Sequence, residues 1–279
     1  MKIGIVGLGL IGGSLGIDLT KQGYEVVGVS RRQETCDIAV KNKVVSQAST
    51  DFQVLADTQL IFVCTPIAHI LDTIAKITPH ISSETIITDV ASVKESIVKS
   101  ATKLWANFVG SHPMAGTANQ GILAAIPDLF QNAPCVITTV DDTNPEAVKS
   151  VIQIWQKLGC NIYNATPLNH DRAVAWISHL PVMISANLID SCVNFQDQEV
   201  VSLAKQLASS GFRDTSRVGG GNVELGLMMA QYNRQQVLAC LKAYQANLDS
   251  IINTIENEQW QDLETLLTKT QQQRPNFVE

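Results

Sequence analysis

His112 is the residue of this sequence whose type and surroundings best suit acid–base chemistry. It lies in the stretch Gly110-Ser111-His112-Pro113-Met114-Ala115-Gly116, at the end of a short apolar run. A histidine between serine and proline, with glycines on both sides, is not in the setting of a helical core residue. Neutral imidazole accepts a proton, as an enzyme that takes a hydride from an alcohol carbon requires beside the hydroxyl group. We therefore predict that His112 is a catalytic base, whereas His69 and His80 have no comparable setting.

Ser92 is a second candidate for chemistry, and its pattern allows two interpretations. It lies in D-V-A-S-V-K-E at residues 89–95, after another predicted strand. Ser92 and Glu95 form an S-x-x-E pattern, which is typical of a capping box at a helix N-terminus. Capping and catalysis explain this serine about equally well.

A glycine-rich stretch near the N-terminus predicts a dinucleotide site. It consists of Gly7, Leu8, Gly9, Leu10, Ile11 and Gly12, after an apolar run and before a helical pattern. In such a loop the first glycine makes a tight turn, the second lets the backbone approach a pyrophosphate, and the third lets the helix lie close to the strand. The pyrophosphate then binds the free amides of the helix N-terminus.

The residues after the second predicted strand favour NADP over NAD. An NAD site usually carries an Asp or Glu there for the ribose hydroxyls, and this chain has Ser30-Arg31-Arg32 instead. A serine can donate to a 2′-phosphate, and an arginine can meet it through two N–H groups. A solvated basic turn is the alternative interpretation.

Cys64-Thr65-Pro66 ends the predicted central strand and has two compatible roles. Thr65 suits the N-cap of a helix and Pro66 its first position. The carboxyl end of a central strand is also where open α/β sheets bind ligands, so we assign these residues to the cofactor site.

The C-terminal half holds candidates for substrate binding. His170 and His179 are nine residues apart, so in a straight helix they point to opposite sides, and only one can face the cleft. Pro181 leaves the Ile177 carbonyl without its helical donor, which predicts a kink beside His179. We therefore favour His179 as the cleft residue.

Arg213 and Arg217 lie in G-F-R-D-T-S-R-V at residues 211–218, which we predict to be a break between helices. Arginine is suited to hold a carboxylate. A solvated loop is the alternative.

Composition excludes several classes of function. The chain has 279 residues, 45% of them apolar, a net charge of −6 and a pI near 5.4, which argues against nucleic acid and anionic membrane surfaces. Six cysteines without a C-x-x-C pair favour buried thiols over disulfides or a metal site. No secretory leader precedes the glycine loop, and no uncharged apolar stretch approaches about 18 residues. We expect a cytoplasmic protein that binds small molecules and no metal, nucleic acid or membrane.

The order of the predicted elements indicates an α/β fold with two domains. Apolar runs alternate with helical patterns up to residue 165, which predicts a doubly wound, parallel, Rossmann-type sheet. The predicted strands are residues 2–6, 25–30, 60–64, 85–88, 107–110 and 133–139. Thr166-Pro167 is typical of a helix start, and we place the domain boundary before it. The predicted helices beyond it are residues 167–194, 199–209, 222–256 and 258–270.

Residues 222–256 have more apolar positions than one helix face needs. A helix of this kind usually packs against a partner chain, so we expect a dimer.

The sequence resembles the prephenate and arogenate dehydrogenases of tyrosine biosynthesis along its whole length. The resemblance rests on G-L-G-L-I-G-G-S at 7–14, T-D-V-A-S-V-K at 88–94, G-S-H-P-M-A-G at 110–116, S-H-L-P at 178–181 and G-F-R-D-T-S-R at 211–217. It implies a nucleotide-binding domain, residues 1–165, and an all-helical domain, residues 166–279, whose helices interlock in a homodimer. It also implies oxidative decarboxylation of a cyclohexadienyl acid, with His112 accepting the proton of the ring hydroxyl.

The resemblance further implies roles for individual residues. Ser92 matches a serine that supports the catalytic histidine, and Arg217 matches an arginine that holds a substrate carboxylate. His179 matches the histidine of the S-H-L-P motif. We place three more residues at the substrate site, namely Arg213, Gly116 and Thr117.

Two departures from the family pattern concern the substrate. Gly219-Gly220-Gly221-Asn222 replaces a more acidic stretch that contains tryptophan, and Val182 replaces a histidine found in many members. A histidine there could donate to the keto group of prephenate and, when charged, would repel the ammonium of arogenate. Because Val182 can do neither, we expect arogenate as the substrate, oxidised with the NADP that Ser30-Arg31-Arg32 predicts.

Three alternatives stay open. One is a prephenate dehydrogenase that uses NAD or NADP. Another is a related two-domain enzyme that acts on a hydroxy or imino acid and typically carries a catalytic lysine on its interdomain helix, although no lysine lies between Lys157 and Lys205. The third is a non-catalytic NADP-binding sensor, which would not need His112.

Overall fold

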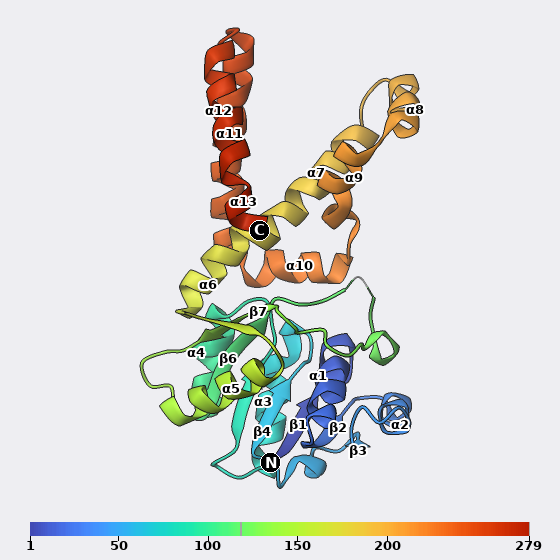
Figure 1. Cartoon of the computed structure of the whole chain (residues 1–279), viewed down its shortest axis with the longest axis vertical. Coiled ribbons are helices and arrows are strands. Elements are labelled where there is room, and N and C mark those ends of the chain that lie inside the picture. The colour runs from blue at the N-terminus through green and yellow to red at the C-terminus, as the bar shows by residue number, and fades with distance from the viewer. Residues whose placement is uncertain (118, 279) are drawn as a thin grey trace.

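One sheet forms the base of the structure, and a group of long helices rises from it (Figure 1). The computed structural model describes residues 1–117 and 119–278. Within them the sheet has eight strands in the order β3-β2-β1-β4-β5-β6-β7-β8. The strands are β1 (Lys2–Val6), β2 (Glu25–Val29), β3 (Gln47–Ser49), β4 (Leu60–Val63), β5 (Ile86–Asp89), β6 (Phe108–Pro113), β7 (Pro134–Thr138) and β8 (Asn161–Ala165). Strand order reverses beside β1, as in a Rossmann-type sheet, so the predicted fold class is confirmed.

Helices cover both faces of this sheet. They are α1 (Leu10–Lys21), α2 (Gln33–Lys41), α3 (Ile70–Ile77), α4 (Glu95–Leu104) and α5 (Pro145–Lys157), with the short 3₁₀ turns η1 (Phe52–Leu55), η2 (Ile67–His69), η3 (Thr78–His80) and η4 (Ile122–Ala124). The helical part consists of α6 (Pro167–Val174), the π turn η5 (Ala175–His179), α7 (Leu180–Val193), α8 (Gln198–Leu207), α9 (Ser210–Ser216), the 3₁₀ turn η6 (Arg217–Gly220), α10 (Val223–Tyr232), α11 (Arg234–Glu256), α12 (Trp260–Gln273) and α13 (Pro275–Val278).

The side chains of β4 alternate between two apolar clusters, one on each face of the sheet. Leu60 and Phe62 belong to the cluster beneath α1 and α5, and Ile61 and Val63 belong to the cluster beneath α3 and α4. All four are fully buried. A strand covered on both faces is expected to be apolar throughout, and this explains the uninterrupted L-I-F-V run.

Strand β7 runs antiparallel to β6, so the prediction of a wholly parallel sheet is wrong at this edge. His112 pairs with Val136 in the antiparallel register. The described residues between the two strands form only the short turn η4, and a parallel connection needs a crossover segment that is usually a helix. Helix α5 supplies such a crossover between β7 and β8, which are parallel.

The two edge strands, β3 and β8, were not predicted from the sequence. β3 has only three residues, and β8 reads N-I-Y-N-A, with none of its residues buried. An edge strand has one neighbour and is partly solvated, so its apolar pattern is weak.

The predicted helix over 222–256 is two helices, α10 and α11, broken at Asn233. Asn233 is buried, and its side-chain amide donates to the backbone carbonyl of Asp171 at 2.8 Å. Residues 211–218 are also not the predicted break between helices, because they form α9 and the start of η6. The helix start at Thr166-Pro167 is confirmed, since the Thr166 hydroxyl accepts from the Asn169 amide at 3.2 Å.

Pro167–Val193 is a helical stretch that by length and composition alone could cross a membrane, which the sequence analysis did not anticipate. A core helix of a soluble protein meets the same criterion. The stretch carries the polar side chains of His170 and Asp171, which are buried against the sheet part of this chain and not in lipid. Polar groups of this kind are costly inside a bilayer.

Candidate active site

The candidate residues converge above the carboxyl ends of the central strands. The loops after β1, β4 and β5 meet there, and β6 brings His112 to the same edge. Helix α6 packs against α4, and α10 packs against η2 and η5. The helical part therefore covers the edge of the sheet at which open α/β folds bind ligands (Figure 1).

The glycine loop has the geometry that a dinucleotide requires. Gly7 has φ +103°, and a Cβ atom there would lie 2.7 Å from the Cys64 carbonyl group. A Cβ atom on Gly12 would overlap the Gly7 carbonyl oxygen, whereas one on Gly9 meets no atom within 4 Å. Helix α1 begins at Leu10 and has no side-chain cap. The first helical amides are thus left for an anionic ligand beside an open backbone.

Thr65 does not cap a helix, so the prediction that it is an N-cap residue is wrong. η2 begins at Ile67 with Pro66 at its N-cap position, and α3 begins only at Ile70. The Thr65 hydroxyl is buried without a hydrogen-bond partner among the described residues. Since a buried hydroxyl normally has a partner, this orphaned group beside Gly7 fits a bound cofactor. The neighbouring Cys64 is a free thiol whose pKa is raised by burial.

Ser30-Arg31-Arg32 follows β2, at the position where a dinucleotide site meets the adenosine ribose. Ser30 is half-buried, and its hydroxyl lies 3.5 Å from the Arg32 backbone nitrogen. Both arginines are exposed, and neither forms an ion pair within the described part of the chain. These groups are free to meet a phosphate.

Ser92 does not form the expected capping box. Helix α4 begins at Glu95, and no side chain at its N-cap residue Lys94 caps it. The acceptor is instead Asp171 of α6, whose two carboxylate oxygens lie 2.7 Å from the Lys94 nitrogen and 2.8 Å from the Glu95 nitrogen. The Ser92 hydroxyl is buried and has no protein partner among the described residues. The absence of capping leaves this hydroxyl available to a ligand.

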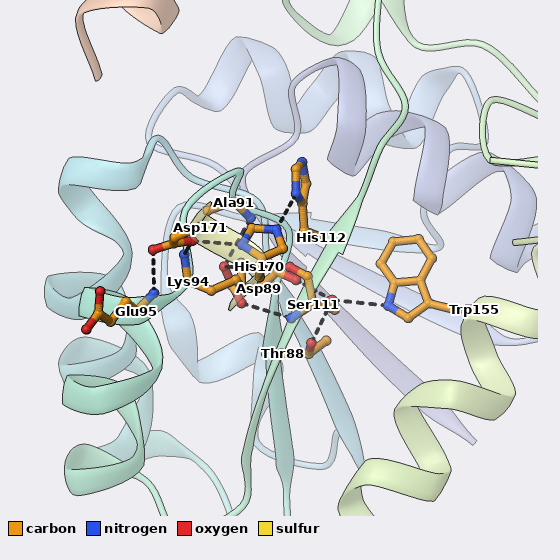
Figure 2. Close-up of polar contacts among 10 residues, drawn as sticks. All are labelled: Thr88, Asp89, Ala91, Lys94, Glu95, Ser111, His112, Trp155, His170 and Asp171. Carbon is orange, nitrogen blue, oxygen red and sulfur yellow. Dashed lines mark hydrogen bonds and ion pairs between the residues drawn. The ribbon is translucent and has the colours of Figure 1, made fainter. Parts of the chain in front are cut away.

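His112, His170 and Asp171 form a line of hydrogen bonds (Figure 2). The Nδ1 atom of His112 lies 2.8 Å from the Nε2 atom of His170, and the Nδ1 atom of His170 lies 2.7 Å from an Asp171 oxygen. His112 is 8% exposed, His170 2% and Asp171 1%. No described residue hydrogen-bonds the Nε2 atom of His112, so that nitrogen remains for a ligand.

Both His170 and His179 are buried at this site, so the prediction that only one of them can face it is wrong. The reason is the π turn Ala175–His179, which lies between the two and closes its hydrogen bonds over an extra residue. The 100° per residue of a straight α-helix therefore does not apply. The π turn ends at His179, two residues before Pro181, and a kink was predicted beside His179.

Asn233 fixes the orientation of His179. Its amide nitrogen donates to the Asp171 carbonyl and lies 3.1 Å from the Nδ1 atom of His179. Nδ1 is thus the acceptor, and a neutral His179 carries its proton on Nε2. That Nε2 atom is buried and has no partner among the described residues, so it can donate to a ligand.

A buried network holds the backbone beneath His112 (Figure 2). The Lys94 ammonium group contacts the Asp89 carboxylate and donates to the Ser111 carbonyl at 2.8 Å. The Ser111 hydroxyl donates to the Asp89 carbonyl at 2.5 Å and accepts from the Trp155 indole at 3.1 Å. Ser111, the residue before His112, is therefore fixed by hydrogen bonds through both its carbonyl and its hydroxyl group.

The electrostatics of the site favour the neutral forms of His112 and His179. Burial, with the nearby charges of His170, Lys94 and His179, holds the pKa of His112 well below its ordinary value of 6.5. Burial lowers the pKa of His179 to about 4, although the Asp171 carboxylate opposes the shift. Burial also lowers the pKa of Lys94, against the attraction of Asp89. A neutral imidazole at position 112 can accept a proton.

The predicted substrate residues outside this centre are exposed. Arg213 pairs with its neighbour Asp214 at 3.2 Å, and Arg217 begins η6 with its side chain in solvent. Gly116 and Thr117 lie in the exposed loop after β6. Within the described residues, no hydrogen bond or ion pair joins these four to the buried centre.

Several polar residues of the centre had no role predicted from the sequence, namely Asp89, Lys94, Trp155, His170, Asp171 and Asn233. His170 was set aside because the helix was assumed to be straight. Asp89 and Lys94 were visible within D-V-A-S-V-K-E, and a lysine directly after an apolar strand and loop is a signal that could have been used.

Comparison with known proteins agrees with this arrangement. The model of the prephenate dehydrogenase nucleotide-binding domain matches residues 15–164, and that of the prephenate dehydrogenase dimerization domain matches residues 166–269. The prephenate dehydrogenase of Bacillus subtilis is 27% identical over 266 residues, which are 93% of this chain and 71% of that protein. The cyclohexadienyl dehydrogenase of Zymomonas mobilis is 29% identical over 262 residues, 92% of this chain and 89% of that protein.

Solved structures give the same result. The crystal structure of Synechocystis arogenate dehydrogenase is 51% identical, with a TM-score of 0.92 and complete coverage of both chains. In fold, the chain also resembles the prephenate dehydrogenase of A. aeolicus in complex with hydroxyphenyl propionate and NAD+, at 22% identity and a TM-score of 0.93 over 99% of this chain and 98% of that one. The chain therefore belongs to the prephenate dehydrogenase family, with a nucleotide-binding domain followed by a helical dimerisation domain.

Proposed function

We propose that this protein oxidises and decarboxylates arogenate to tyrosine, with NADP as the hydride acceptor and His112 as the base. The observation that carries the proposal is the setting of His112, which is buried, has a pKa held well below 6.5, and has Nδ1 engaged by His170 and Nε2 without a partner among the described residues. An acceptor nitrogen in that state is what the hydroxyl of a cyclohexadienyl acid needs.

The chain's own groups divide the remaining tasks at the substrate. His112 Nε2 takes the hydroxyl proton, the Ser92 hydroxyl orients that oxygen, and His179 Nε2–H donates to a second oxygen of the substrate. Arg217 and Arg213, with Gly116 and Thr117, are proposed to receive the rest of the molecule. The proton returns to the phenolate oxygen after carbon dioxide leaves, so the base is regenerated in each turnover.

The bound dinucleotide supplies the hydride acceptor. Gly7, Leu8, Gly9, Leu10, Ile11 and Gly12 would hold its pyrophosphate, and Cys64, Thr65 and Pro66 would line the same site. The open space over Gly9 and the orphaned Thr65 hydroxyl support this assignment. Ser30, Arg31 and Arg32 would meet the 2′-phosphate, because no carboxylate at the end of β2 repels it.

Arogenate is proposed over prephenate on the basis of Val182. Helix α7 continues past Pro181, and Val182 is half-buried, with its side chain 3.6 Å from where a Cβ atom would lie on Gly226 of α10. An apolar residue there offers no donor to a keto group and no charge to repel an ammonium. The 51% identity to an arogenate dehydrogenase also supports this choice.

We further propose a cytoplasmic homodimer with a domain boundary between residues 165 and 166. The match to a dimerization domain supports the dimer. The helical part also carries exposed apolar side chains, among them Leu203, Leu207, Leu227 and Leu267.

One assay tests the activity. Purified protein is incubated with arogenate or prephenate and with NADP or NAD, and the absorbance of the reduced nicotinamide is followed. We expect the fastest turnover with arogenate and NADP. If the protein turns over prephenate but not arogenate, it is a prephenate dehydrogenase. If it binds NADP and turns over neither acid, a non-catalytic sensor is favoured.

A further inference from the structure

We infer that His170 and Asp171 form a proton relay behind His112, which moves the positive charge of the accepted proton away from the reacting ring until the phenol forms. The inference rests on the proposed function and concerns residues for which no role was predicted. In it, His112 is the catalytic residue, and His170 and Asp171 are positioning residues that act through it.

The hydrogen bonds determine which nitrogen carries each proton. The Asp171 carboxylate accepts from the backbone amides of Lys94 and Glu95, and backbone amides can only donate. Both Asp171 oxygens therefore act as acceptors, and His170 donates to the carboxylate through Nδ1–H. A neutral His170 then accepts at Nε2, so His112 donates to it through Nδ1–H. By this chain of contacts, the lone pair of His112 that faces the ligand is on Nε2.

Burial and charge make His170 the better place for the extra proton. All three side chains are at least nine-tenths buried, so water does not solvate a charged ring in this line. An imidazolium at His112 would lie near the positive charge of Lys94, whereas one at His170 would contact the Asp171 carboxylate directly. A charged ring is stabilised by a hydrogen-bonded opposite charge and destabilised by a like charge.

The steps balance in atoms and electrons. The O–H bond of the substrate breaks and its proton binds His112 Nε2, while the Nδ1–H bond of His112 breaks and that proton binds His170 Nε2. The ring carbon loses a hydride to the oxidised dinucleotide, and the bond to the ring carboxylate breaks to release carbon dioxide. The electron pair of that bond completes the aromatic ring as a phenolate, which takes its proton back along the same path. No net proton is gained or lost.

The tautomers can be measured without any turnover. Neutral histidine in water prefers its proton on Nε2, so the relay requires the less common Nδ1–H form at both His112 and His170. We propose 15N NMR of the histidine rings of the ligand-free protein, with resonances assigned through His112→Gln and His170→Gln. A proton on Nε2 of His112 in the native protein would overturn the relay.

Kinetics of His170→Gln supply the second test, with His80→Gln as the matched control at a remote, half-buried histidine. We expect His170→Gln to lower kcat about tenfold to a hundredfold, a part of what general-base catalysis contributes, with KM values nearly unchanged. Asp171→Asn should act in the same direction, and His80→Gln should have no effect. A His170→Gln enzyme with native kcat would overturn the relay.

A proton inventory separates a relay from simple support of the fold. The single-turnover rate in mixtures of H2O and D2O should depend non-linearly on deuterium content in the native enzyme, because two protons move together, and linearly in His170→Gln. A linear inventory in the native enzyme would contradict the inference. If the native protein oxidised neither acid, the proposed function would fail, and the NMR tautomers would still decide whether the relay is built.

Discussion

The Asp171 carboxylate lies 2.8 Å from the backbone nitrogen of Glu95, so a residue of the helical domain caps the first turn of α4 in the nucleotide-binding domain. Its other oxygen accepts from the Lys94 nitrogen at 2.7 Å and from His170. The same carboxylate thus joins the two domains and orients the histidines of the site.

We expect Asp171→Ala to lower the free energy of unfolding by about 3 kcal/mol, because the buried Lys94 amide, the partly buried Glu95 amide and one imidazole N–H lose their acceptor. Asp197→Ala is the matched control, since Asp197 caps the exposed helix α8 through the Glu199 and Val200 amides. The Asp197→Ala substitution should lower the free energy of unfolding by only about 1 kcal/mol. Urea unfolding at a fixed protein concentration measures both, and equal costs would contradict the structural role of Asp171.

His112→Asn should lower kcat by about 100- to 10,000-fold, the usual contribution of a general base. Asparagine keeps a polar side chain of smaller size, so binding of both ligands should persist. Steady-state kinetics and calorimetric titration with NADP measure the two effects. A variant with near-native turnover would remove His112 from the catalytic role.

Ser30→Asp combined with Arg31→Ala should reverse the cofactor preference from NADP to NAD. The change removes a charge-assisted contact worth about 1.5–3 kcal/mol, or roughly a tenfold to hundredfold change in affinity, and adds an acceptor for a free ribose hydroxyl. Lys41→Ala, at an exposed cation at the end of α2, is the control. Equal use of both cofactors by the native protein would show that the basic turn has no part in recognition.

Val182→His should shift the ratio of kcat/KM values toward prephenate. The imidazole adds a donor for the keto group, and its charged form repels the ammonium of arogenate. Val193→His, at the exposed end of α7, controls for the added histidine. The assignment of specificity to position 182 is wrong if the native protein prefers prephenate or if the ratio stays unchanged.

Acid should destabilise the protein through His179. Its folded pKa of about 4 lies below the ordinary 6.5, so between these values the unfolded chain binds a proton that the native protein does not. The free energy of unfolding should therefore be unaffected by this group above pH 6.5 and fall by roughly 3 kcal/mol as the pH drops to 4. Denaturant unfolding of native, His179→Gln and His80→Gln proteins at both pH values tests this. The decrease in the free energy of unfolding between the two pH values should be smaller only in His179→Gln. An unchanged decrease in that variant would refute the low pKa of His179.

Much of the nucleotide-binding domain could be predicted from the sequence because its signals are local. Gly7 is required by a tight turn and Gly12 by close packing, and both constraints lie within the first dozen residues. The uninterrupted apolar run L-I-F-V at β4 is typical of a strand covered on both faces. His112 could be singled out for the same reason, since its unusual neighbours adjoin it in the chain.

Other features depend on partners that are distant in the sequence, and only the tertiary structure decided them. The cap of α4 is Asp171, 76 residues after Glu95, so the local S-x-x-E pattern at Ser92 was misleading. Likewise, α10 and α11 separate at Asn233, whose side-chain amide hydrogen-bonds to Asp171 and His179. The periodicity of apolar residues along a helix does not indicate such contacts.

The sequence by itself determined the alternation of strands and helices in the Rossmann-type domain, the glycine loop and the histidine that could act as a base, because each is specified by neighbouring residues. The tertiary structure alone decided that His170 stands behind His112. One π turn inside a helix that sequence periodicity treats as straight changes the direction of every side chain beyond it. The histidine line therefore depends on packing between two domains, and no spacing rule could have predicted it.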